Sequence, residues 1–484
     1  MANEFPKSTT TEFKKSLGLL DSTALVAGSM IGSGIFIVSA EMARTLGSPG
    51  WLLIAWAITG LLTIIAALSY GELASMMPKA GGQYVYIREA FNPLSGFLYG
   101  WTFFMVIQTG TIAAVAMAFS KFMGVLFPWF SEKNILLDLG FVHMNTVHLL
   151  AISMIWVLTF NNIGGIRNGK WVQNIFTVLK VALLIGFIII GLFLAHSAPA
   201  IAANKAVFWK PVSPDGVSLT GWALIAALGV SLVGSLFSAD AWNNITFASA
   251  EVKNPRKNIP LSLVLGVTIV IVLYILANLV YLNALPLRGA SAGQDVFSRG
   301  IQYAVNDRLG SASMYGLFGA GAALLMATFV VISTFGCNNG LILSGARVYY
   351  AMARDRLFFR KTGQLNSKGV PANGLIIQAI WASLLCLSGT YSNLLDYVVF
   401  AVLIFYVLTI AGIFVLRKKQ PDTERPYKAF GYPVIPALYI LAASFILCLL
   451  LIYKTEYSSY GLGIVILGIP AYYLWKYWES GKTD

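Results

Sequence analysis

The sequence predicts an all-α integral membrane protein with twelve transmembrane helices, and three observations support this. The chain of 484 residues is 57% hydrophobic and only 11% charged, whereas soluble domains are about 25% charged. Apolar stretches of 18 or more residues recur along its whole length, and a stretch of that length crosses a bilayer as a helix. Two of these stretches contain a polar interruption made of small residues near their centre.

The apolar stretches define the expected spans in chain order. They cover residues 18–46, 51–77, 94–125, 146–163, 171–195, 219–251, 260–284, 312–342, 372–389, 391–416, 433–453 and 458–478. Because the spans fill nearly the whole chain, we expect a single polytopic domain over residues 1–484. The count of soluble domains by length does not apply to such a chain.

The spans fall into two sets of five and a pair. The interrupted helices, first and sixth, begin corresponding sets over residues 18–195 and 219–416. Since five is an odd number, the second set must cross the membrane in the opposite sense. The sequence therefore predicts two inverted five-helix repeats, followed by two additional helices in residues 433–478.

Charge placement predicts the orientation. The formal net charge is +13, but lysine and arginine concentrate in the loops of one side, as the positive-inside rule requires of cytoplasmic loops. We therefore expect a multi-pass protein of the cell (inner) membrane with both termini in the cytoplasm, and no nucleic-acid partner. The polar N-terminus precedes no cleavage site of small residues, so no cleavable signal peptide is expected.

Motifs for covalent chemistry are not found in the sequence. Cys337, Cys386 and Cys448 all fall in expected spans without CxxC spacing, so neither a disulfide framework nor a metal site is expected. There is no GxxxxGK[ST] loop for a nucleotide, and no GxSxG or HExxH motif for an enzyme. We expect no cofactor, no metal and no catalytic residue.

The first interruption lies in residues 28–36, which read Gly-Ser-Met-Ile-Gly-Ser-Gly-Ile-Phe. Gly32, Ser33 and Gly34 lack bulk, and glycine tolerates unusual backbone angles. Unwinding here would expose carbonyl groups at the end of one half-helix and N–H groups at the start of the next. Such ends attract cations and anions respectively, so a zwitterionic amino acid fits. Alternatively, Gly28 and Gly32 permit close helix packing.

The second interruption, in residues 234–242, contains an acid at membrane depth. Asp240 lies 11 residues before Glu251, or roughly 16 Å of helix, so it falls near the middle of a bilayer about 30 Å thick. An intramembrane acid is by default functional, although a protonated or capping aspartate with a structural role is the alternative. Phe237, one turn earlier, either closes over a ligand or packs in the core. Two such breaks in corresponding positions point to a transporter binding site.

One lysine within a span and four charged residues near span ends complete the list of candidate residues. Lys180 lies ten residues past Lys170, roughly 15 Å into the bilayer, too deep to snorkel to the surface. It either lines the cavity or binds exposed carbonyl groups. Four charged residues near the ends of spans, expected on the cytoplasmic side, either pair across helices and gate that side or remain solvated: Glu72, Arg88, Glu251 and Asp355.

Long motifs show that the sequence resembles the amino acid–polyamine–organocation transporters, and most closely a bacterial member of the L-type amino acid transporter branch. "IGSGIF" at 31–36 matches the break of the first helix, and "YGELASMMPKAGGQYVYIREAF" at 70–91 matches the second and third helices. "GKWVQNIFTVLKVALL" at 169–184 matches the fifth helix, and "DAWNNITFASAEVKNPRKNIP" at 240–260 the sixth. The resemblance covers about residues 15–435.

The resemblance implies an L-amino acid as the substrate. The expected binding residues of the first helix are Met30, Ile31, Gly32, Ser33, Gly34 and Ile35. The carboxylate is expected at the N–H groups of Ser33, Gly34 and Ile35, and the ammonium at carbonyl groups near Met30, Ile31, Phe237 and Ser238. Asp240, Asn243 and Thr111 are implied as further pocket positions.

The resemblance also implies how transport is coupled. Phe237 matches the gating aromatic residue, and Lys180 stands where sodium-coupled relatives hold an ion. Cys337 replaces a serine of the family pattern near Lys180, and Ala241 replaces a glycine in the second break. Because residues 126–145 contain no cysteine, a disulfide-linked heavy subunit is not expected.

The function expected from these observations is sodium-independent secondary transport of L-amino acids, neutral ones by branch resemblance, by alternating access. The transporter is either an exchanger or a proton-coupled importer. Two other functions remain open at this point: a transporter-like sensor that binds amino acids without moving them, and a membrane-embedded enzyme.

Overall fold

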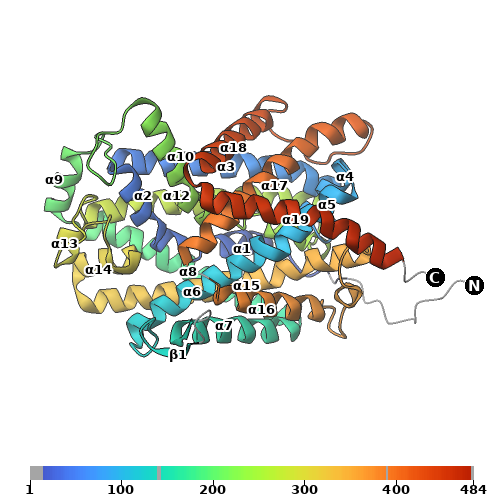
Figure 1. Ribbon diagram of the computed structural model, residues 1–484, viewed down its shortest axis with the longest axis horizontal. Helices are drawn as coiled ribbons and strands as arrows, with labels where there is room; N and C mark the ends of the chain where they lie inside the picture. Colours follow the sequence, from blue (N-terminus) through green and yellow to red (C-terminus); the bar gives the residue numbers. More distant parts are fainter. Residues whose placement is uncertain (1–12, 14, 139–142, 389–390, 481–484) are drawn as a thin grey trace, which may run out of the picture.

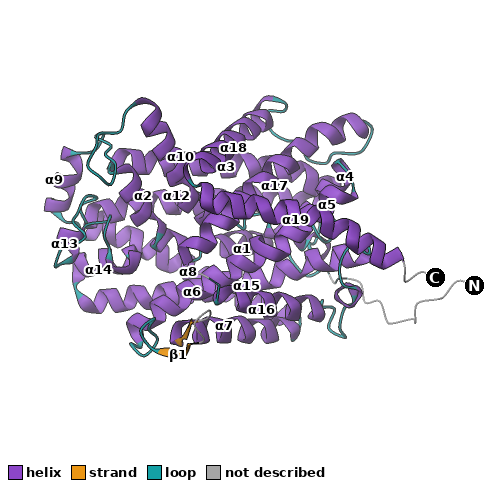
Figure 2. Cartoon of the chain, viewed as in Figure 1, coloured by secondary structure: helices purple, strands orange, loops and turns teal. Residues whose placement is uncertain are grey.

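The computed structural model is almost entirely helical, with long helices that run alongside one another (Figures 1 and 2). It describes residues 13, 15–138, 143–388 and 391–480. Within this part of the chain, the strands are confined to one short antiparallel pair, β1 (Ile135–Asp138) and β2 (His143–Asn145), in the loop after the third span. The predicted all-α class is confirmed.

The first five spans are built from helices that follow each other closely. Their elements are α1 (Leu19–Met30), η1 (Gly34–Phe36), α2 (Val38–Leu46), α3 (Pro49–Met76), α4 (Gln83–Ala90), α5 (Pro93–Thr102), η2 (Phe103–Ile107), α6 (Gln108–Leu126), α7 (Thr146–Ile163), α8 (Ile166–Ile189) and η3 (Ile190–Leu194). Here η1 is a 3₁₀ turn, whereas η2 and η3 are π-helical turns within longer spans.

The remaining spans follow after a short helix. The elements are α9 (Ala198–Ala206), α10 (Gly221–Ser238), α11 (Asn244–Phe247), η4 (Ser249–Glu251), α12 (Pro255–Ala284), α13 (Val296–Arg299), η5 (Val305–Asp307), α14 (Leu309–Phe318), α15 (Ala320–Arg354), η6 (Arg360–Gly363), α16 (Ala372–Cys386), α17 (Tyr391–Lys419), α18 (Val434–Tyr453) and α19 (Thr455–Ser480).

The described residues contain eleven helices that are long and apolar enough to cross a membrane. The ninth expected span, 372–389, corresponds to α16, which has only 15 residues. At 1.5 Å per residue such a helix is about 22 Å long, less than the roughly 30 Å of a bilayer core. Residues 389–390 lie outside the described part of the chain, so the count of twelve stays a prediction.

One expected boundary is wrong. Residues 312–342 were predicted as a single span, but the structure divides this stretch at Gly319, where φ is 82° and α14 ends. The span proper is α15, which begins at Ala320 and continues to Arg354. The apolar pattern runs through Gly319 without interruption, so hydropathy alone conceals the turn.

Burial separates central from peripheral spans. In the span of α5 and α6, 94% of the most apolar 18-residue window is buried, whereas the figure for α19 is 17%. The two interrupted helices lie inside the bundle: α1 packs against α8, α12 and α15, and α10 packs against α2, α3, α17 and α18. The fold therefore places both interruptions where lipid does not reach them.

Candidate functional site

The first interruption is a true break in the helix. α1 ends at Met30, and Ile31 takes extended angles with φ −74° and ψ 90°. The chain then turns through η1 before α2 begins at Val38. Because the helical hydrogen bonds stop here, the carbonyl groups of residues 28–32 need other partners, and in the bilayer no water would supply them. The predicted unwinding of the first helix is confirmed.

Three side chains from two neighbouring helices meet these carbonyl groups. Lys180 of α8 is fully buried, and its ammonium donates to Gly28 O and, at 2.8 Å, to Ile31 O. Ser333 Oγ of α15 donates to Ile31 O at 3.1 Å. Cys337 Sγ, one turn further, donates to a carbonyl of the same break, that of Ser29, at 3.0 Å. Lys180 thus binds exposed carbonyl groups, the second of the two roles open to it.

The second interruption has a strained backbone. α10 ends at Ser238, and Ala241 takes φ 64°, a left-handed conformation that costs a residue with a Cβ roughly 1–2 kcal/mol. Only α11 and the 3₁₀ turn η4 follow before the chain leaves the span. The predicted break of the sixth helix is confirmed, and Ala241 occupies the position where the family pattern has glycine.

The two breaks contact one another directly. A Cβ atom built on Gly34 would lie 2.1 Å from Ser238 Oγ and 2.9 Å from Ser238 Cα, so only glycine fits there. The Tyr274 hydroxyl of α12 lies 2.9 Å from Met30 O and 3.2 Å from Ser238 O. It therefore links two of the four carbonyl groups near which the substrate ammonium is expected. The predictions from sequence did not include Tyr274, since a tyrosine in an apolar span is an ordinary core residue.

A small cavity lies beside the second break. Three of the expected pocket residues, Thr111, Asp240 and Asn243, line it together with Gln83, Gln108 and Tyr406 among others. Its volume is about 20 Å³, room for about one water molecule. A second cavity of similar volume lies against Asp240 and Tyr406 on another side. Neither cavity therefore has room for an amino acid.

Hydrogen bonds fix the polar groups of this cavity. Tyr406 of α17 donates to Asp240 Oδ1 at 2.5 Å. Asn243 Nδ2 donates to Gln83 Oε1 at 2.9 Å, and Gln83 Nε2 donates to Thr409 Oγ1 at 3.0 Å. Gln83 and Tyr406 were not predicted, but Gln83 directly follows Gly81 and Gly82, both at positive φ. A glutamine after two glycines at a span end was an available signal.

The other expected substrate-binding residues do not line either cavity. Phe237 and Ser238, and Met30 through Ile35 of the first helix, are buried. Lys180 and Cys337 lie at the first break rather than in the cavities. The expected residues therefore form two adjoining groups, one at the contact between the breaks and one around Asp240. Among the described residues no group of His, Cys, Asp or Glu could hold a metal ion.

All four helix-end charges singled out in the sequence are paired. Arg88 binds Asp355, which also accepts from the Tyr84 hydroxyl at 2.8 Å. Glu251 accepts from Arg347 Nε at 2.9 Å, and both side chains are buried. Each pair joins two segments that are far apart in the sequence: Arg88 of α4 to Asp355 after α15, and Glu251 of η4 to Arg347 of α15.

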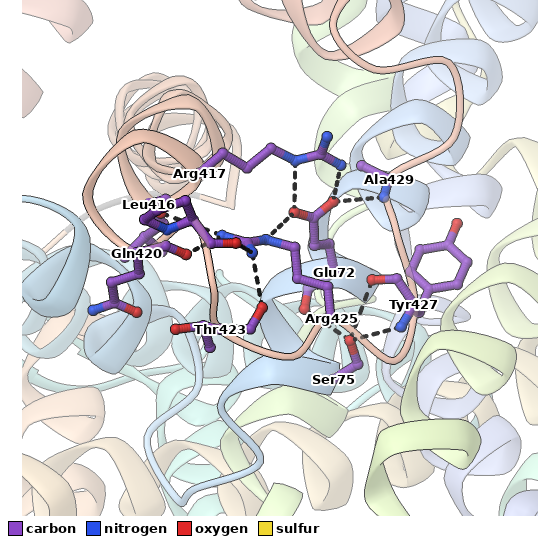
Figure 3. Close-up of polar contacts among 10 residues, drawn as sticks. Glu72, Ser75, Leu416, Arg417, Gln420, Thr423, Arg425, Tyr427 and Ala429 are labelled. Carbon is purple, nitrogen blue, oxygen red and sulfur yellow. Dashed lines mark hydrogen bonds and ion pairs between the residues drawn. The ribbon is translucent and has the colours of Figure 1, made fainter.

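Glu72 lies at the centre of the largest of these clusters (Figure 3). Its two carboxylate oxygens accept from Arg417 at 2.9 and 2.7 Å, and Arg425 lies 3.3 Å away. The backbone N–H of Ala429 donates a further bond at 2.6 Å. The cluster ties the end of α3 to the end of α17 and to the loop that follows it.

Comparison with known proteins agrees with this architecture. The amino acid permease family model matches residues 17–470. The mouse b(0,+)-type amino acid transporter 1 is 30% identical over 475 residues, which cover 98% of this chain and 90% of that protein. The human large neutral amino acids transporter small subunit 2 is 30% identical over 468 residues, covering 96% of this chain and 81% of its relative. The chain belongs to the amino acid permease family, whose members are multi-pass membrane transporters and not enzymes.

Proposed function

We propose that this protein is a sodium-independent secondary transporter of neutral L-amino acids that works by alternating access. The observation that carries the proposal is the Lys180 ammonium at the carbonyl groups of Gly28 and Ile31. A fixed cation at this point does the electrostatic work that a sodium ion would do. The relatives named above, one b(0,+)-type and one for large neutral amino acids, support the amino acid class.

The proposed substrate lies between the two breaks. Its carboxylate meets the N–H groups of Ser33, Gly34 and Ile35, since helix N-termini attract anions. Its ammonium meets the carbonyl groups of Met30 and Ser238, in place of the Tyr274 hydroxyl. Because Gly34 of η1 now packs against Ser238 of α10, η1 and α10 must separate to admit the ligand.

The remaining proposed features concern side-chain recognition and assembly. The substrate side chain points to the group around Asp240, Asn243 and Thr111, and Phe237 closes over it. The protein lies in the cell membrane with both termini in the cytoplasm. It works without a disulfide-linked heavy subunit, since its cysteines fall within helices and residues 126–145 contain none.

Counterflow in proteoliposomes tests the proposal. Purified protein is reconstituted with an excess of unlabelled amino acid inside, and labelled amino acid is added outside. We expect saturable accumulation, unchanged when choline replaces sodium, because Lys180 already occupies the ion position. A sensor would bind the labelled ligand without accumulating it, and a requirement for sodium would refute the built-in cation. An imposed proton gradient then separates the exchanger from the proton-coupled importer.

A competition series tests the zwitterion site. Each neutral amino acid is compared with its amine lacking the carboxylate and with its acid lacking the amino group. We expect only the parent amino acid to compete. The amine leaves the N–H groups of the first break without a carboxylate, and the acid leaves the carbonyl groups without an ammonium. Equal competition by the amines would contradict the carboxylate site at Ser33, Gly34 and Ile35.

A further inference from the structure

A groove that shares no lining residue with the cavities beside Asp240 lies at the common end of three apolar helices. It is formed where α15 ends, α16 begins and α19 ends, and its volume is about 420 Å³. This is much larger than either cavity beside Asp240. The candidate span of α19 ends at Glu479, which lines the groove, so we place the groove at the level where the helices leave the hydrocarbon and enter the headgroup region.

One wall of the groove is aromatic and rigid. Trp475 of α19 packs between Phe358, with rings stacked at 6.3 Å, and Phe359, edge to face at 5.1 Å. Its indole N–H donates to Arg356 O at 3.2 Å. Trp478 packs against Trp475 at 5.6 Å and remains about half exposed. Tryptophan is the residue that membrane proteins place at the interface between lipid and water.

The other wall is polar and cationic. Arg360 Nε binds Glu479 Oε1 at 2.6 Å, which partly neutralises it. Lys361 is exposed, and its ammonium has no carboxylate partner among the described residues. Asn373 lies beside it and donates to the Lys361 carbonyl at 2.9 Å. The groove therefore combines an apolar aromatic platform with a cation that has no carboxylate partner in the part of the chain that the structure describes.

We propose that this groove binds one anionic phospholipid. The phosphate lies between Arg360 and Lys361, and an acyl chain follows Phe359, Ile377 and Trp478 toward the outer surface of α19. α19 is the least buried of the candidate spans, so the bilayer reaches the groove directly. A soluble anion would use only the cations and would leave the aromatic platform without a partner.

Lipid titration of the purified full-length protein in detergent, followed by native mass spectrometry, tests the proposal. The probe is dioleoyl phosphatidylglycerol, with dioleoyl phosphatidylcholine as the zwitterionic comparison. One phosphatidylglycerol should bind with at least about fivefold preference, because each cation near a membrane surface favours anionic lipid by about that factor. Lys361→Gln should remove about this factor. Lys368→Gln, a change of the same kind in the same loop but outside the groove, should have no effect.

A second pair of variants should change lipid affinity in opposite directions. Glu479→Gln removes the carboxylate that competes for Arg360, so it should strengthen binding of phosphatidylglycerol. Trp478→Ala should weaken binding of both lipids, since it shortens the apolar wall. Equal binding of the two lipids by the wild type, equal losses in Lys361→Gln and Lys368→Gln, or displacement of the lipid by millimolar inorganic phosphate would each overturn the proposal.

Discussion

Gly34 is a residue at which the two helix breaks touch. A Cβ here would lie within 2.9 Å of the backbone of Ser238, closer than real Cβ atoms come to such atoms. We expect Gly34→Val to abolish uptake and Gly34→Ala to reduce it strongly, while both proteins still insert in the membrane. Gly186→Ala is the matched control, since no atom lies within 4 Å of a Cβ added there. Normal transport kinetics in Gly34→Val would refute the contact.

Ala241 shows the cost of a side chain in the left-handed region. Its φ of 64° is easy for glycine and unfavourable for alanine. Ala241→Gly should therefore stabilise the protein by about 1 kcal/mol and raise its melting temperature in detergent. Ala239→Gly, two residues earlier at φ −90°, should lower it. The reverse order of the two melting temperatures would contradict the strain.

At the scale of elements, Lys180 holds the break of α1 against α8, and Ser333 and Cys337 hold it against α15. Lys180→Ala leaves the carbonyl groups of Gly28 and Ile31 without their cation. We expect turnover in counterflow to fall at least tenfold, because the break of α1 is then no longer held against α8. Substrate affinity should change less. Lys121→Ala is the control, since Lys121 faces only Glu132 at 3.6 Å near a helix end. Unchanged turnover in Lys180→Ala would show that the lysine does not replace the ion.

The Glu72 cluster is the corresponding contact between α3 and α17. Glu72 is buried, accepts hydrogen bonds from Arg417 and from the Ala429 N–H, and forms an ion pair with Arg425, so Glu72→Gln leaves both guanidinium groups without their counter-charge. Such a loss costs about 3–5 kcal/mol when the pair is buried, somewhat less here because Arg417 is partly exposed. We expect a clear fall in melting temperature. Glu424→Gln, which breaks an exposed pair with Arg256, should change it little.

At the scale of the whole molecule, the two breaks pack against each other and ion pairs join the ends of several helices. The cavity beside Asp240 has a volume of only about 20 Å³, so the proposed binding of an amino acid between the breaks requires η1 to separate from α10. The contacts that must then change are those of Gly34, Ser238 and Tyr274. The helix-end charges form pairs, Arg88 with Asp355 and Glu251 with Arg347, rather than remaining solvated; that they gate the cytoplasmic side stays a prediction. The inverted repeat of residues 18–195 and 219–416 remains a prediction.

The sequence by itself determined the class, most spans and both breaks. Hydropathy is sufficient for the spans, because a helix in lipid must be apolar over a length that the bilayer sets. The breaks can be recognised in the sequence because polar residues in a span cost free energy and small residues such as glycine weaken its helix. Such residues are therefore expected in a span only where they have a function. Lys180 was identified by the same reasoning, from its depth alone.

Only the tertiary structure decided which groups meet. The apolar pattern continues across Gly319, because glycine has no polar side chain to interrupt it. Hydropathy therefore does not reveal the turn there. Tyr274, Gln83 and Tyr406 are remote in sequence from the residues they bind, and a tyrosine or glutamine in a span has many partners open to it. The division of the expected site between the contact at Gly34 and the cavity at Asp240 likewise depends on how η1 and α10 pack. Packing between helices depends on how the shapes of side chains fit together in three dimensions. The periodic pattern of apolar residues in a sequence does not contain this information.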